Sequence, residues 1–185
     1  MVRVISGTAG GLKLQTLDSD STKPTLDRVK EAMFSMVREA VYSASVLDLF
    51  SGNGALGIEA LSRGAENCFF NDKNRQCCDI IKKNLLHTKL DDKAEVSCAD
   101  YTQALSSCKK RGLRFGLVLL DPPYGNGFEK DALSLISKSG LATPYCTAVC
   151  EHSASESMPG VIGSFRLIKT KIYGTVGVSV FENEV

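Results

Sequence analysis

Four acidic residues lie in the middle of the chain, each at or near the end of an apolar run. Asp48 lies within VLDLF, Asp72 follows CFFN, Asp100 follows VSCA and Asp121 follows LVLL. In an open α/β sheet, ligands bind outside the carboxyl ends of the strands. We therefore expect the four carboxylates along one edge of a parallel sheet. A carboxylate within an apolar strand, such as Asp48, is costly to bury without hydrogen-bond partners, which indicates a specific role.

A glycine-rich turn follows the first of these acids. Residues 52–57, Gly-Asn-Gly-Ala-Leu-Gly, have the spacing of a dinucleotide-binding loop, and Asp72 lies twenty residues after Gly52. Glycines let the backbone approach a ligand closely, and the helix start that follows offers free N–H groups. NAD or another adenosyl ligand fits such a loop, and a plain tight turn is the alternative. Asp48 favours S-adenosylmethionine over NAD. Its carboxylate would repel the diphosphate of NAD, whereas it can orient a turn that meets the sulfonium and ammonium groups of S-adenosylmethionine.

The segment Asp121-Pro122-Pro123-Tyr124 favours methylation of an exocyclic amine. Such an amine is a poor nucleophile, and two acceptors on its N–H bonds would aim its lone pair at an in-line methyl group. We expect the Asp121 carboxylate and the Pro122 carbonyl to be these acceptors. The prolines fix φ at about −65° and remove competing donors, and Tyr124 offers a face on which a base can stack. The target base must be unpaired or flipped out, and an ordinary turn is the alternative.

Alternating strands and helices are predicted to position these residues. Apolar runs predict strands at 46–50, 68–71, 94–98, 115–120 and 145–151. Helices are predicted near 54–64, 74–87, 101–111 and 128–138. This alternation indicates an α/β, Rossmann-like fold with a mainly parallel sheet and helices on both faces. The tail predicts an antiparallel β-hairpin around Tyr173-Gly174.

Residues 1–44 differ in pattern from residues 45–185, which form the predicted main domain. RVIS and LKLQTL around Thr-Ala-Gly-Gly predict a small hairpin, residues 18–23 a linker, and Pro24-Thr25 the start of a helix that Thr25 caps. Residues 1–44 carry six basic and five acidic residues, a weak charge for binding RNA.

Length and composition are those of one globular domain with a small appendage. The chain has 185 residues, 43% hydrophobic and 23% charged, and its net charge of +1 excludes a strongly basic nucleic-acid coat protein. No apolar run approaches the roughly 18 residues of a membrane span, so we expect a cytoplasmic protein without membrane contact. A monomer is the default expectation for its oligomeric state. Seven irregularly spaced cysteines indicate reduced thiols and no disulfide framework. Cys146, Cys150 and His152 could suggest a zinc site, but a fourth ligand is missing, so no metal is expected. Asn84 is expected on an exposed helix face.

Together these motifs resemble a known family. VLDLFSGNGALGIEALSRGA, Asp72, Cys98-Ala99-Asp100 and LLDPPYG look like the class I methyltransferases of the RsmD type. RVISGTAGG with KPTLDRVKEAMFSMV is similar to that family's amino-terminal signature. The resemblance implies transfer of a methyl group from S-adenosylmethionine to guanine N2 in 16S ribosomal RNA. It also implies a seven-stranded sheet, a C-terminal hairpin and an amino-terminal extension that helps to bind RNA.

The resemblance also implies roles for single residues. The methionine part of the cofactor would be surrounded by Asp48, Phe50, Ser51, Gly52, Asn53 and Gly54. Asp72 would hold the ribose hydroxyls and Asp100 the adenine amine, while Asp121 to Tyr124 would hold the guanine. The expected substrate-binding residues are Arg3, Thr25 and Arg28, beside the cofactor or the RNA. Ribosomal RNA within a small-subunit particle is the expected partner.

Three other functions stay open at this point. The Asp121 turn serves any planar amine, so adenine N6 in nucleic acid or a glutamine amide in protein are alternative targets. The glycine loop also fits an NAD-dependent oxidoreductase. A non-catalytic RNA-binding module with the same fold is the third alternative.

Overall fold

The structure is a computed structural model that describes residues 2–17 and 24–185, without the side chains of residues 24–26. The predicted linker at 18–23 lies outside the described residues, as does the side chain of the predicted cap Thr25. Within the described part, no helix is long and apolar enough to cross a membrane.

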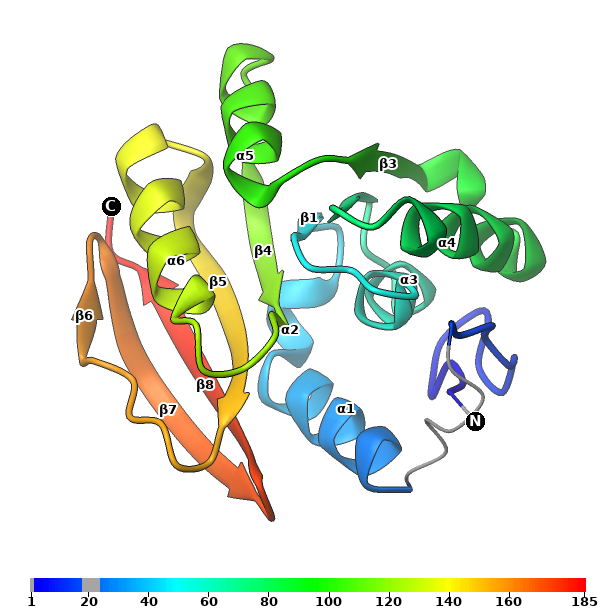
Figure 1. Cartoon of the computed structure of the whole chain (residues 1–185), viewed down its shortest axis with the longest axis horizontal. Helices are drawn as coiled ribbons and strands as arrows, with labels where there is room; N and C mark the ends of the chain where they lie inside the picture. Colours follow the sequence, from blue (N-terminus) through cyan, green and yellow to red (C-terminus); the bar gives the residue numbers. More distant parts are fainter. Residues whose placement is uncertain (1, 18–23) are drawn as a thin grey trace.

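One sheet forms the centre of the described molecule (Figure 1). Its strand order is β3-β2-β1-β4-β5-β8-β7-β6. The strands are β1 (Ser45–Asp48), β2 (Asn67–Asp72), β3 (Ala94–Cys98), β4 (Phe115–Leu120), β5 (Ala142–Ser153), β6 (Val161–Ile162), β7 (Phe165–Tyr173) and β8 (Val176–Asn183). The first five in this order run parallel, and β8, β7 and β6 are antiparallel to their neighbours. The predicted fold class and C-terminal hairpin are confirmed.

The described residues form eight strands where seven were expected. The additional strand is β6, whose two residues pair with Phe165 and Arg166 at the start of β7. A two-residue strand leaves no alternating pattern in the sequence, so only its pairing reveals it.

Helices cover both faces of the sheet (Figure 1). They are α1 (Pro24–Met36), α2 (Arg38–Val41), α3 (Ala55–Ser62), α4 (Arg75–Thr88), α5 (Tyr101–Lys110) and α6 (Phe128–Ser139), with a 3₁₀ turn at Asp91–Lys93. Helices α1, α3 and α4 share one hydrophobic cluster, and α5 and α6 share the other. The central strand β4 reads FGLVLL because it is covered on both faces: Leu117 and Leu119 enter the first cluster, Val118 and Leu120 the second.

Residues 2–17 form the predicted hairpin-like loop, with an antiparallel bridge between Arg3 and Lys13. This loop is fixed to α3 through Glu59, a fully buried carboxylate that accepts the N–H groups of Ile5 at 2.7 Å and Ser6 at 3.0 Å. Glu59 also pairs with Lys30 of α1 at 3.3 Å. One carboxylate therefore connects the loop, α1 and α3.

The expectation that Asn84 is exposed was wrong. Its side chain is buried between α4 and the amino-terminal loop. The amide accepts the N–H of Gln15 at 2.8 Å and donates to the carbonyls of Gln15 at 3.1 Å and Asn53 at 2.9 Å. Asn84 therefore joins the amino-terminal loop to the glycine loop, a contact that the periodicity of α4 does not reveal.

Candidate active site

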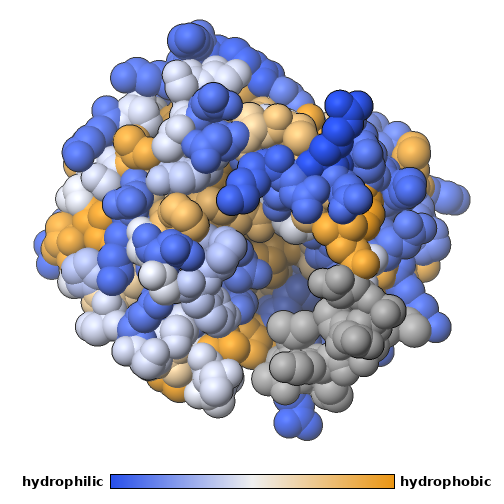
Figure 2. Space-filling view, viewed as in Figure 1, coloured by the Kyte–Doolittle hydropathy of each residue, from blue (hydrophilic) through white to orange (hydrophobic). Residues whose placement is uncertain are grey.

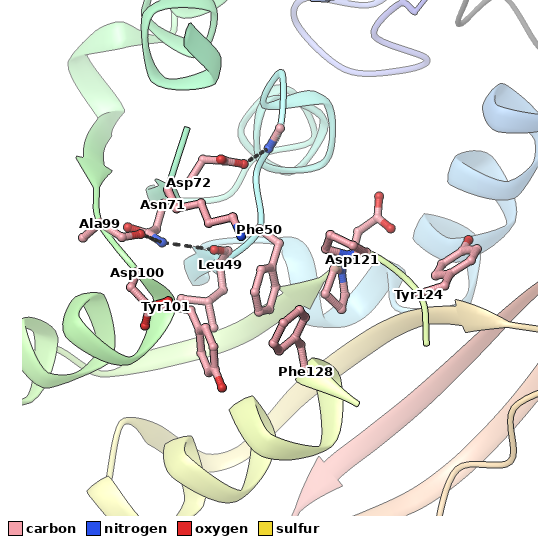
Figure 3. A pocket seen from close by; sticks show the side chains of 14 residues that line it. Leu49, Phe50, Asn71, Asp72, Ala99, Asp100, Tyr101, Asp121, Tyr124 and Phe128 are labelled. Atoms are coloured by element: carbon pink, nitrogen blue, oxygen red, sulfur yellow. Dashed lines mark hydrogen bonds between the residues drawn. The ribbon is translucent and has the colours of Figure 1, made fainter. Parts of the chain in front are cut away.

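A cavity of about 450 Å³ opens at the carboxyl ends of β1, β2 and β4, where the strand order reverses. Figure 2 shows this hollow, and Figure 3 shows its lining from close by. The lining residues are Leu49, Phe50, Gly52, Asn71, Asp72, Lys73, Ala99, Asp100, Tyr101, Asp121, Pro122, Pro123, Tyr124 and Phe128. The volume suits a small-molecule ligand. Both motifs that the sequence analysis singled out, the glycine loop and the Asp121 turn, thus contribute to one cavity.

Asp72 holds the glycine loop in place. Its carboxylate accepts the N–H of Gly52 at 2.8 Å and, through the other oxygen, the N–H of Asn74 at 2.8 Å. Gly52 has a φ of +54°, and no atom lies within 4 Å of the position that a Cβ would take. The backbone is therefore open to the cavity at this point. Each carboxylate oxygen of Asp72 keeps a second lone pair with which it can accept a hydroxyl.

Asp48 lies beneath the glycine loop and does not line the cavity. It is 1% exposed, and its Oδ2 accepts the N–H of Gly57 at 2.9 Å while its Oδ1 has no partner among the described residues. Burial raises the pKa of the Asp48 carboxyl to about 7, and the charge of Asp72 adds to this rise. Asp48 thus acts on the cavity through the loop and the start of α3.

Ser51, Asn53 and Gly54, which the sequence analysis also assigned to the cofactor, shape the loop without lining the cavity. The hydroxyl of Ser51 donates to the carbonyl of Asp48 at 2.7 Å. Asn53 accepts the N–H of Ala55 at 3.2 Å at the start of α3, and Gly54 has a φ of +82°. These contacts set the path of the backbone that borders the cavity.

Asp100 and three aromatic rings form another part of the wall. Asp100 caps α5, accepting the N–H of Thr102 at 2.9 Å and its hydroxyl at 2.6 Å, and these bonds lower the pKa of its carboxyl. The rings of Phe50, Tyr101 and Phe128 lie with centroids 5.4 to 6.2 Å apart. Sequence reasoning missed Tyr101 and Phe128, because they begin helices that only the fold brings to Phe50.

Asp121 and Tyr124 lie in the cavity wall apart from Asp72 and Asp100, with Phe50 and Phe128 between the two groups in Figure 3. The Asp121 side chain is exposed to the cavity, and its carboxylate accepts no hydrogen bond from the described residues. Burial raises its pKa well above the usual value, and the charges of Glu151 and Asp48 raise it further. Because the side chain is accessible to solvent from the cavity, water screens these effects and limits the rise.

Glu151, which sequence reasoning also missed, contacts the cavity wall through Tyr124. It lies near the end of β5, is 9% exposed, and accepts the hydroxyl of Tyr124 at 2.6 Å. Burial raises the pKa of Glu151, and burial and the bond to Glu151 raise that of Tyr124. The signal was present in AVCEHS, an acid near the end of an apolar strand, like the four acids first recognised.

Of the predicted substrate-binding residues, Arg3 and Arg28 do not line the cavity, and the side chain of Thr25 lies outside the described residues. Arg3 pairs with Asp27 at 2.9 Å on the surface, and Arg28 is exposed. Lys73, which the sequence analysis did not single out, lines the cavity beside Asp72.

Comparison with known proteins places the chain in a family. The profile of the family described as "Conserved hypothetical protein 95", which includes the RsmD proteins, matches residues 2–182. The chain belongs to that family. The RsmD resemblance predicted from the motifs is therefore confirmed.

Relatives within the family match the chain over nearly its whole length. Ribosomal RNA small subunit methyltransferase D of Escherichia coli is 30% identical over 183 residues, covering 99% of this chain and 90% of its own. YlbH of Bacillus subtilis is 36% identical over 181 residues, covering 98% of each chain. The solved structure of yhhF from Escherichia coli has a TM-score of 0.86 at 27% identity, covering 99% of this chain and 98% of its own. Sequence and fold thus agree on the family.

Proposed function

We propose that this RsmD-family protein transfers a methyl group from S-adenosylmethionine to N2 of a guanine in 16S ribosomal RNA. Membership of the family and the name of its Escherichia coli relative support an S-adenosylmethionine-dependent ribosomal RNA methyltransferase. The observation that carries the proposal is a single cavity bordered by both the glycine loop and the Asp121 turn. The proposal includes a small-subunit particle as the substrate and a monomeric, cytoplasmic enzyme.

The charges around the cavity suit a cationic cofactor better than a dinucleotide. Three carboxylates line the cavity, those of Asp72, Asp100 and Asp121, against one ammonium, that of Lys73. A diphosphate would be repelled by this wall, whereas a sulfonium and an ammonium are attracted to it. This balance disfavours the alternative of an NAD-dependent oxidoreductase.

The residues present fit S-adenosylmethionine. Asp72 would accept the ribose hydroxyls, Asp100 the adenine amine, and the rings of Phe50, Tyr101 and Phe128 would cover the adenine. The open backbone at Gly52 would border the methionine part, with Asp48 beneath it holding the loop. When bound, the cofactor supplies an electrophilic methyl group on a sulfonium.

The Asp121 turn would hold and activate the guanine amine. The Asp121 carboxylate and the Pro122 carbonyl accept its two N–H bonds, so that its lone pair points at the methyl group. Tyr124 supports the base, and Pro123 stiffens the turn between them. The bond from Tyr124 to Glu151 holds the ring in one orientation. Asp121 would accept the proton that the amine loses after transfer.

The proposal is tested with 16S ribosomal RNA from cells that lack the gene. The purified protein and labelled S-adenosylmethionine are added to this RNA, as small-subunit particles and deproteinised, and the digested nucleosides are identified by mass spectrometry. We expect labelled N2-methylguanosine. Label in N6-methyladenosine would identify adenine N6 as the target instead of guanine N2. Label in protein alone would instead favour a glutamine amide as the target.

A first variant tests the role of Asp121. Asp121→Ala is expected to bind S-adenosylhomocysteine with the wild-type affinity in calorimetry but to transfer methyl about 10²–10³-fold more slowly, because one acceptor for the amine is lost. Asp79→Ala, at an exposed position of α4, is the matched control and should keep the wild-type rate. Wild-type turnover by Asp121→Ala would refute this role.

A further inference from the structure

Strand β7 carries a positively charged surface that the proposed function leaves unused. Residues 161–176 contain three basic residues, Arg166, Lys169 and Lys171, and no acidic residue. Arg166 is paired with Glu184. Lys169 and Lys171 are exposed, and neither forms an ion pair with the described residues. Two free ammonium groups thus project from one strand.

A β-bulge determines the face on which these lysines lie. Leu167 pairs with Phe181 of β8 and Lys169 pairs with Val180, so Ile168 is an extra residue in β7. Directly paired residues share a face of the sheet. Lys169 therefore lies on the face of Val180, the face covered by α1, and not on the opposite face that buries Leu167 and Phe181.

The same register brings Lys171 into line with the site. Lys171 pairs with Val178 of β8, and Val178 pairs with Glu151 of β5, so the three residues form one row on one face. Adjacent strands are about 4.8 Å apart, which puts the backbone of Lys171 roughly 10 Å from that of Glu151. Glu151 in turn holds Tyr124, the proposed support of the target base. Lys171 is thus two strands away from the residue that holds the proposed base support.

The end of the β7–β8 hairpin is also open to a large partner. Of the described strands, β6 pairs with β7 only at Phe165 and Arg166, so the other edge of β7 is free beyond that point. In the register, Tyr173 at the end of β7 and Val176 at the start of β8 lie level with Ser153 at the end of β5, and the hairpin connection follows them at this end of the sheet (Figure 1). A strand of RNA that enters the cavity can therefore pass over this surface.

We propose that Lys169 and Lys171 bind backbone phosphates of the RNA that flanks the target base. The inference rests on the proposed RNA substrate and adds to it a binding surface outside the amino-terminal extension. Charge complementarity identifies the partner, because two exposed ammonium groups that form no ion pair with the described residues attract a polyanion. Such contacts position the RNA and carry no base specificity.

The test uses the double variant Lys169→Ala/Lys171→Ala and deproteinised 16S ribosomal RNA from cells that lack the gene. Loss of two phosphate contacts should raise the dissociation constant for this RNA about 10–30-fold at about 0.15 M salt. It should also reduce the slope of log affinity against log salt by about 1.4–1.8. Affinity for S-adenosylhomocysteine should stay at the wild-type value, because neither lysine lines the cavity.

Two further variants make the result specific. Lys109→Ala/Lys110→Ala removes the same charge from the exposed end of α5. The chain continues from there to the amino end of β4, whereas the cavity lies at its carboxyl end, so this variant should leave RNA affinity unchanged. Lys169→Arg/Lys171→Arg keeps the charge and should bind RNA within about twofold of wild type.

The outcomes separate this inference from the proposed function. Wild-type affinity and salt slope in Lys169→Ala/Lys171→Ala, with a wild-type enzyme that methylates this RNA, would overturn the lysine surface alone. An equal loss in Lys109→Ala/Lys110→Ala would overturn it as well, because the effect would then reflect net charge only. A wild-type enzyme that methylates no RNA would instead overturn the proposed function.

Discussion

At the residue scale, the carboxylates of the site differ in the number of N–H groups that each accepts. Asp72 accepts two, one of them from the glycine loop, and Asp48 accepts one. Asp121 accepts none from the described residues, so its oxygens are free for a substrate. Asp100 also accepts one N–H, that of Thr102, but unlike Asp48 it lines the cavity. Hydrogen bonding and position together explain why four acids with the same sequence signal are assigned different roles.

A second feature at the residue scale is the interaction between the carboxylates of Asp121 and Glu151. Two carboxylates close together cannot both ionise readily, so each disfavours the charge of the other. The charge of Glu151 helps to raise the pKa of Asp121. Asp121 must be ionised to accept an amine N–H, so we expect the rate of methyl transfer to fall as the pH falls through this pKa.

Glu151→Gln tests that coupling. The variant removes the charge but keeps an oxygen that can accept the Tyr124 hydroxyl, so the pKa of Asp121 should fall. In a profile of kcat/KM against pH, the midpoint of the acid limb should move to lower pH. Glu156→Gln, whose carboxylate accepts the N–H of Gly125, is the control and should leave the midpoint in place. A midpoint that stays put or rises in Glu151→Gln would contradict the coupling.

At the element scale, α3 holds the amino-terminal loop and α1 against the methyltransferase sheet. Its Glu59 is fully buried, and its partners come from three segments: Ile5 and Ser6, Lys30, and Arg63 at 2.7 Å. Burial lowers the pKa of Lys30, and the charge of Glu59 opposes that shift. The extension that sequence reasoning treated as separate is thus joined to the main domain by one buried carboxylate.

Glu59→Ala is therefore expected to destabilise the protein severely. It leaves the buried ammonium of Lys30 and two backbone N–H groups without their acceptor, which costs about 3–5 kcal/mol. Urea unfolding measures this loss, with Glu66→Ala at an exposed position as the control. A loss below about 1 kcal/mol would mean that water replaces the carboxylate at little cost.

At the scale of the whole molecule, strand β1 carries a group whose ionisation opposes folding. Asp48 is surrounded by core residues of β1, and its folded pKa of about 7 lies above the usual value of 3.8. A raised folded pKa means that the folded state binds the proton more tightly than the unfolded state does. This stabilisation is fully present below about pH 4 and is lost as the pH rises through about 7.

Asp48→Asn should abolish this pH dependence in the cofactor-free protein. The amide keeps an oxygen for the N–H of Gly57 and has no charge to bury. The difference in unfolding free energy between variant and wild type should grow in favour of the variant from pH 4.5 to 8, towards a limit on the order of 4 kcal/mol. Urea unfolding across this range measures the difference, with Asp79→Asn as the exposed control. Parallel curves for Asp48→Asn and wild type would refute the assigned pKa shift.

The sequence by itself determined the alternation of strands and helices, the glycine loop and the four strand-end acids. These features depend on local spacing and residue type, which are readable along the chain. Only the tertiary structure decided the contacts between distant segments: Glu151 with Tyr124, the rings of Phe50, Tyr101 and Phe128, and Asn84 with the amino-terminal loop. It also decided, through the bulge at Ile168, that Lys169 and Lys171 share a face with Glu151. Strand register and helix packing follow from the cooperative burial of the whole core, because a shift of one residue reverses the faces of a strand without changing its sequence pattern.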